Sequence, residues 1–122
     1  MHIVFDTSKQ GLETLMKPWQ VEILRFLWKS GREGVTSKDV WSHLSRVYKI
    51  SRASVINFLQ KLAEDGVLKN EPQTGKGGYR GFYTPKLDER EFGLLVVRTI
   101  LTRLSEVFPD AAHEAIKEYT TR

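Results

Sequence analysis

The segment 51–84 constrains the fold more than any other part of the chain. It opens with Ser51, whose hydroxyl can accept a hydrogen bond from the free N–H groups of a first helical turn. The apolar residues that follow are spaced by four and three and share one helical face: Val55, Leu59 and Leu62. Gly66 comes next, and glycine ends helices readily because it adopts positive φ without a steric penalty. The sequence therefore predicts a helix from about residue 51 to residue 65.

Two short apolar pairs of strand type follow this helix, Val67-Leu68 and Phe82-Tyr83. The segment 72–81 between them is interpreted as a turn and contains four glycines, Lys76 and Arg80, with no acidic residue. Glycine lets such a hairpin approach another surface closely. A helix with a small, polar outer face followed by a basic hairpin is the layout of a winged helix-turn-helix. The predicted fold is therefore mainly α with a small β-hairpin wing.

Two earlier helices complete this layout. Pro18 suits the first position of a helix that ends at Gly31, with a buried face of Trp19, Ile23, Leu24, Leu27 and Trp28. Val35 is expected to form a strand stub, and Thr36 to cap a second helix. The inner stripe of that second helix is Val40, Trp41, Leu44 and Val47. A short link, residues 48–50, leads to the third helix, and His43 is expected to be solvated.

The C-terminal region is expected to form two further helices, from Asp88 to about Phe108 and from Pro109 onward. The apolar arc of the first is too wide for a single packing partner in so small a domain. One interpretation is an intrachain helical hairpin that closes over the core. The favoured one is a dimerisation arm, since apolar stripes of this size are not normally left exposed to solvent. The predicted dimer interface is Phe92, Leu94, Val97, Ile100, Leu101, Leu104, Phe108 and Ile116.

The chain thus divides into an N-terminal arm (1–16), a winged helix-turn-helix (17–87) and dimerisation helices (88–122). The arm is expected to lie on the body, with a short strand over residues 2–5 and a loop after it. Residues 1–87 carry 14 Lys and Arg against 8 Asp and Glu, whereas residues 88–122 carry 5 against 7. The positive excess therefore lies on the part of the chain that contains the proposed helix and hairpin, which favours a polyanionic partner.

Candidate DNA-binding residues follow from this layout, because an α-helix fits the major groove of B-form DNA. Ala53 and Ser54 are small enough for close approach, and Asn57 faces outward and could bind an adenine edge. Arg52 and Lys61 are assigned to phosphates. The helix starts offer N–H groups to phosphate oxygens, and the wing adds basic and aromatic contacts. The full set is Ser37, Lys38, Ser51, Arg52, Ala53, Ser54, Asn57, Lys61, Lys76, Tyr79 and Arg80.

Other function classes find little support. The chain has no cysteine, which excludes disulfides and thiolate metal sites, and its three histidines lack metal-ligand spacing. There is no nucleophile motif, and the glycine-rich turn lacks the Gly-Lys-Ser/Thr sequence of a phosphate-binding loop. No apolar run is long enough to span a membrane, and the N-terminus does not read as a secretory signal. The sequence predicts a cytoplasmic protein that is not an enzyme and has no cofactor or metal.

The chain also resembles the penicillinase-repressor family, the BlaI/MecI-type winged-helix regulators together with the copper-responsive repressors. The resemblance covers residues 17 to about 108 and is carried by PWQVEILRFLWKSG, VTSKDVWSHL, SVINFLQKLAEDGVL and YRGFYTPKLDEREF. It implies a homodimer, joined through its C-terminal helices, that binds a near-palindromic operator and blocks transcription. It also implies that Ser54 and Asn57 lie near bases and that the 73–81 hairpin touches the DNA backbone.

The sequence departs from the family pattern in three respects. Its wing is longer and richer in glycine than the family's usual short turn. The cysteine pairs of the copper branch are absent, which excludes metal sensing by that route. Some members are inactivated by cleavage at an Asn-Phe bond in the C-terminal region, but the only such bond here, Asn57-Phe58, lies in the proposed recognition helix. The inducing signal, including any small-molecule effector, is therefore left open.

The leading hypothesis is a sequence-specific regulator of transcription, a repressor that binds double-stranded DNA as a homodimer. The alternative is a winged-helix module that joins proteins within a larger transcription assembly. A stable homodimer on its own would argue against this alternative, whereas a monomer with an exposed apolar surface would favour it.

Overall fold

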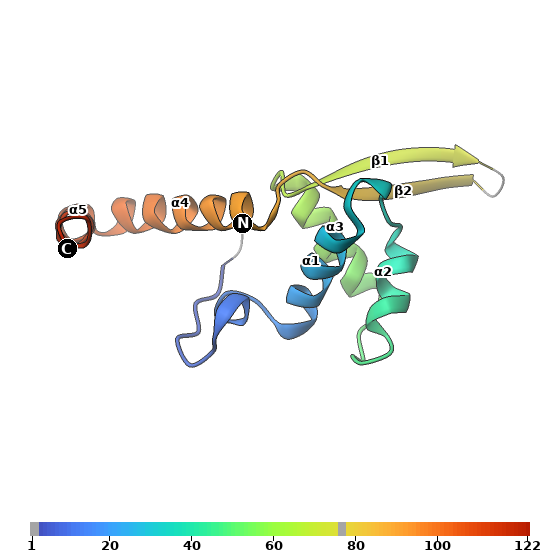
Figure 1. Ribbon diagram of the computed structural model, residues 1–122, viewed down its shortest axis with the longest axis horizontal. Coiled ribbons are helices and arrows are strands. Elements are labelled where there is room, and N and C mark those ends of the chain that lie inside the picture. The colour runs from blue at the N-terminus through green and yellow to red at the C-terminus, as the bar shows by residue number, and fades with distance from the viewer. Residues whose placement is uncertain (1–2, 76–77) are drawn as a thin grey trace. The chain divides into compact units, whose positions relative to one another are not determined.

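The computed structural model describes residues 3–75 and 78–122, without the side chains of residues 32 and 73–80. The chain divides into two compact units, one ending at Asp88 and the other spanning Glu89–Arg122. The first unit contains a 3-10 turn η1, helices α1, α2 and α3, a second 3-10 turn η2 and the hairpin β1–β2 (Figure 1). The second unit contains helices α4 and α5. This is the winged helix-turn-helix that the sequence predicts, with helices C-terminal to it.

Helix α1 (Pro18–Ser30) forms the centre of the first unit and confirms the predicted helix to within a residue. Pro18 occupies its first turn, and Gly31 ends it at φ 65°, where a side chain would be strained. Three of its predicted core residues, Ile23, Leu24 and Leu27, are fully buried. Trp28 is half-buried and donates its indole N–H to the Leu87 carbonyl oxygen at 3.0 Å. The helix is thus held both by apolar burial and by this link to the end of the unit.

Helix α2 (Ser37–Leu44) begins as predicted but ends early. Thr36 and Asp39 form a reciprocal capping box at its start. After the helix, the amides of Val47 and Tyr48 both donate to the Leu44 carbonyl oxygen and close a turn. The prediction of a three-residue link was therefore wrong: the link is Ser45–Ser51. The prediction that Val47 faces the core was also wrong, since it lies beyond the helix and is 79% exposed.

Helix α3 (Arg52–Glu64) confirms the predicted third helix. Ser51 caps it, its Oγ accepting the Ser54 amide at 3.1 Å. The predicted apolar stripe is buried in the core: Val55, Leu59 and Leu62. Gly66 has φ 79° and lets the chain turn directly into the hairpin.

The hairpin is longer than predicted. Strands β1 (Leu68–Gly75) and β2 (Gly78–Pro85) pair antiparallel from Leu68↔Pro85 to Gly75↔Gly78. The interpretation of 72–81 as a turn was therefore wrong, because the backbone ladder continues to within two residues of the tip. Pro72 is compatible with this ladder because it lies in a two-stranded sheet, where every strand has an edge on which no amide donor is needed.

The base of the hairpin is tied to the helices through Val35, which forms the predicted strand stub. Its amide and carbonyl exchange hydrogen bonds of 3.0 and 2.8 Å with Tyr83 of β2. Gly34, after η2 (Gly31–Glu33), makes this approach possible. A Cβ built on it would lie 3.1 Å from Thr84 Cγ2, and its φ is 74°.

Residues 3–16 do not contain the predicted strand within the part that the structure describes. Instead, Asp6 accepts hydrogen bonds from the Ser8 amide and hydroxyl at 3.0 and 2.6 Å, and these bonds hold the pKa of its carboxyl below the usual value. The turn leads into η1 (Gly11–Thr14), which contacts α1. These short-range bonds favour a turn over a strand.

The second unit consists of α4 (Glu89–Val107) and α5 (Pro109–Thr120). Both helices were predicted. The chain turns sharply at Phe108, so that α5 is seen end-on in Figure 1 while α4 runs across the view. The two helices therefore do not lie antiparallel to each other. No residue of α5 is buried.

Candidate nucleic-acid interface

The outer face of α3 is the first part of the candidate interface. Its apolar inner stripe is buried in the core, whereas the opposite face does not pack against the rest of the chain. The residues on that face are exposed: Arg52, Ala53, Asn57, Gln60, Lys61 and Glu64. Asn57 lies near the middle of the helix, about two turns before its C-terminal end. The face therefore combines a small residue, two amides, two cations and one carboxylate, and its amides and cations can bind base edges and phosphates.

The start of α3 is held by a pair of hydroxyls. Ser51 Oγ accepts the Ser54 amide, and it also lies 2.8 Å from Ser54 Oγ. Ser54 is half-buried, whereas Ser51 is exposed. The two hydroxyls are therefore positioned by each other, so that any ligand meets them in a fixed arrangement.

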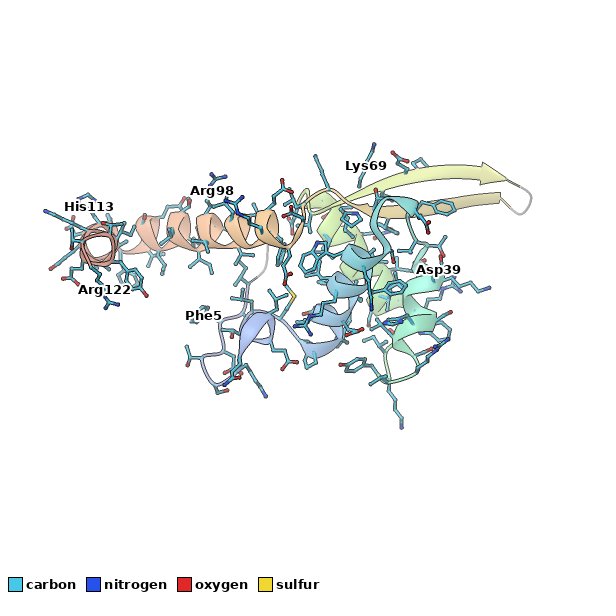
Figure 2. The ribbon with its side chains drawn as sticks, in the orientation of Figure 1. Phe5, Asp39, Lys69, Arg98, His113 and Arg122 are labelled. Carbon is cyan, nitrogen blue, oxygen red and sulfur yellow. The ribbon has the colours of Figure 1, made fainter. Side chains whose placement is uncertain are left out.

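The start of α2 is similarly ordered. Asp39 Oδ2 accepts the Thr36 amide at 3.0 Å, and Figure 2 shows Asp39 in the first turn of the helix. Of the two predicted contact residues here, Lys38 is exposed and Ser37 is half-buried. A carboxylate in this turn favours the helix but partly offsets the attraction of its N-terminus for an anion. Lys38 is thus the better placed of the two for a phosphate.

The wing contributes one charged pair and a backbone scaffold. Lys69 Nζ lies 2.6 Å from Glu71 Oε1 on β1, so its charge is already partnered (Figure 2). Lys76 lies outside the described residues. Tyr79 and Arg80 lie in β2, paired with Thr74 and Gln73, and their side chains lie outside the description.

His43 remains partly solvated, as predicted, because 39% of its side chain is exposed, but it also has partners. Its Nε2 lies 3.0 Å from Glu22 Oε1 of α1, and its ring stacks on Phe26 at 4.4 Å. The pair joins α1 to α2 and so helps to fix the helix that precedes α3. No local pattern in the sequence indicates it, because its partners come from 17 and 21 positions away in the chain.

The predicted dimer interface residues divide into two groups. Phe92 is 0% exposed in the chain itself, and Ile100 is half-buried. The others are all exposed: Leu94, Val97, Leu101, Leu104, Phe108 and Ile116. Val107 and Tyr119 are exposed as well, though the sequence did not single them out as interface residues. The exposed apolar seam thus runs along α4 and into α5.

Two other kinds of site find no place in the described residues. No group of three or more histidine, aspartate or glutamate side chains among them lies close enough to hold a metal ion. Within the same residues, no helix combines the length and the apolar character needed to cross a membrane.

Comparison with known families gives a match over almost the whole chain. The model of the penicillinase repressor family matches residues 18–121. The chain belongs to this family. A penicillinase-repressor chain is a DNA-binding regulator of transcription and not an enzyme, which confirms the prediction from sequence. No curated protein matches the sequence.

The penicillinase-repressor chain is also similar to several solved structures, and the first two below share its fold. A possible transcriptional regulator from Methanosarcina mazei Go1 is 16% identical with a TM-score of 0.54, and the match covers 85% of this chain and 79% of that one. The ferric uptake regulator of Francisella tularensis, solved with iron, is 18% identical with a TM-score of 0.50, covering 66% and 60%. Monomeric BlaI of Bacillus licheniformis, solved with the blaP half-operator, is 21% identical with a TM-score of 0.45, covering 62% and 85%.

Proposed function

We propose that this penicillinase-repressor chain represses transcription as a homodimer that binds a near-palindromic operator in the cytoplasm. The observation that carries the proposal is the outer face of α3. It is exposed along the helix while the inner face is completely buried, so the helix is held rigidly with one face free. Family membership supports DNA as the ligand of that face.

On DNA, the residues of α3 have distinct roles. Asn57, exposed at mid-helix, is suited to an adenine edge: its Oδ1 can accept from the N6 amino group while its Nδ2 donates to N7. Ala53 and Ser54 allow the helix start to lie close to base edges. Arg52 and Lys61 bind phosphates on either side of the groove, together with Ser37, Lys38 and Ser51 at the helix starts.

The wing gives a second, basic contact. Its two strands pair as far as Gly75 and Gly78, which makes it a longer hairpin than the sequence predicts. Lys76, Tyr79 and Arg80 lie at or near its tip in the chain, and we assign them to the DNA backbone. A long hairpin can reach phosphates beyond the groove that α3 occupies.

The homodimer follows from the exposed seam of α4 and α5. Leucine, valine and phenylalanine side chains alternate along it with helical spacing, and a monomer rarely leaves such a stripe in water. A second copy offers the same seam, and a twofold axis would pair two α3 helices with half-sites about one DNA turn apart, or a multiple of it. Phe92 is left out of this interface because it is already buried.

A mobility-shift titration against the chain's own promoter tests the proposal. We expect binding that is tighter than to random DNA and that weakens steeply as salt rises. Asn57→Ala should weaken specific binding by about 1–3 kcal/mol, while the Lys76→Ala/Arg80→Ala variant should weaken specific and random DNA alike. Equal affinity of the wild type for promoter and random DNA would rule out operator recognition. In an in vitro transcription assay, added protein should lower the yield from that promoter.

A further inference from the structure

The link between α2 and α3 has a fixed conformation. It is the seven-residue loop Ser45–Ser51, longer than the three- to four-residue turn of a compact helix-turn-helix. Its first half is closed by hydrogen bonds from the Val47 and Tyr48 amides to the Leu44 carbonyl oxygen, at 3.0 and 2.9 Å. Its second half is held by the Trp41 indole N–H, which donates to the Ile50 carbonyl oxygen at 3.1 Å. The loop is therefore held at both of its halves by α2.

The loop also belongs to a stretch of the sequence that carries basic residues but no acidic ones. Residues 40–63, from within α2 to near the end of α3, include four of the 19 Lys and Arg and none of the 15 Asp and Glu. The remaining residues carry 15 of each, so the entire net charge of +4 belongs to this stretch. Arg46 and Lys49 of the loop supply half of it, and Arg52 and Lys61 of α3 the other half.

The side chains of the loop are available for a ligand. Arg46 and Lys49 are both exposed, and neither forms an ion pair with any residue that the structure describes. Val47 between them is 79% exposed, which leaves an apolar side chain at the loop surface with no partner in the chain. Two free cations and one apolar group on a fixed loop match a nucleic-acid strand, which presents phosphates and apolar sugar faces in alternation.

We propose that the loop Ser45–Ser51 is a third DNA-contacting element beside α3 and the wing, with Arg46 and Lys49 bound to phosphates of the operator. The inference rests on the proposed function. The loop ends at Ser51, the cap of α3, so a start of α3 placed at the groove brings the loop to the DNA strand that borders the groove. Because the hydrogen bonds of Leu44 and Trp41 already hold the backbone, binding loses little loop entropy.

The test compares two doubly substituted proteins that lose the same charge. Arg46→Ala/Lys49→Ala removes the loop cations, and Arg25→Ala/Lys29→Ala removes two exposed cations of α1. Affinity for the promoter fragment is measured over a range of salt concentrations, and ethylation interference maps the phosphates that binding requires. The loop variant should reduce the slope of log K against log salt by about 2 for each bound protomer, because each lost phosphate contact removes about 0.9. It should also lose specific phosphate positions that the α1 variant retains.

The outcomes separate the two proposals. If the wild type binds the promoter and the loop variant shows the slope and the interference pattern of the α1 variant, the loop makes no phosphate contact and the inference is wrong. A wild type that binds no DNA overturns the proposed function itself. Circular dichroism checks that the loop variant is folded, and Arg46→Gln/Lys49→Gln, which removes the charge but keeps a polar side chain with two methylene groups, repeats the comparison if it is not.

Discussion

Trp41 illustrates how a single side chain can fix the path of the chain between α2 and α3. It is half-buried at the end of α2, and its indole N–H satisfies the Ile50 carbonyl oxygen one residue before the cap of α3. The bond therefore joins the end of one helix to the start of the next. A tryptophan in an apolar stripe is readily predicted to be core, but the partner of its N–H depends on the path of a loop, which spacing alone does not reveal.

The Trp41→Phe variant tests this role. Phenylalanine keeps most of the apolar contact but leaves the carbonyl without its donor, so we expect the free energy of unfolding to fall by about 1 kcal/mol in urea denaturation. Trp19→Phe is the matched control, because Trp19 contacts Phe58 edge-on and its indole N–H makes no hydrogen bond within the described residues. Equal losses in the two variants would mean that the indole bond to Ile50 contributes nothing beyond packing.

The helices and the hairpin show which elements a sequence defines by itself. Helices α1 and α3 were predicted closely because their signals are local: Pro18 at the start of one, Ser51 at the cap of the other, and glycine after each. The hairpin was misread over 72–81 because proline and glycine usually mark turns, while strand pairing depends on residues across the ladder. The same holds for His43, whose contacts lie on another helix. Local chemistry thus predicts where elements begin, and tertiary contacts decide how far they extend.

At the same scale, Gly34 determines how the hairpin is joined to the helices. Gly34→Ala combines a left-handed φ with a contact to Thr84, so we expect the free energy of unfolding to drop by about 1–3 kcal/mol. Gly31→Ala is the matched control, since its φ is also positive but a Cβ there meets nothing within 4 Å. In thermal unfolding, the midpoint temperature of Gly34→Ala should be lower than that of Gly31→Ala. The reverse order would show that the close approach at the base of the wing does not limit stability.

At the scale of the whole molecule, the two units carry surfaces of different character. The first carries a buried core and an exposed polar, basic face, and the second carries an exposed apolar seam. The apolar pattern of α4 could be read from sequence, since it follows helical periodicity. Which of its residues are left for a partner could not. Phe92 and Leu94 lie about 200° apart around the helix and so on different apolar stripes, and periodicity alone does not say that the stripe of Phe92 is buried while that of Leu94 is exposed. Only the folded chain distinguishes them.

The proposed homodimer makes the last prediction. Leu101→Glu/Leu104→Glu places carboxylates in the seam, and burying them against a second copy would be strongly unfavourable. We expect the dimer dissociation constant, measured by sedimentation equilibrium, to rise at least 100-fold, or about 2.7 kcal/mol. Thr102→Glu adds the same type of charge at an exposed position between them in the chain, but it points well away from the seam because successive helical residues are rotated by about 100°. It should therefore leave the dimer intact. A wild type that is monomeric at every accessible concentration would refute the twofold arrangement, and so would a seam variant that dimerises as tightly as Thr102→Glu.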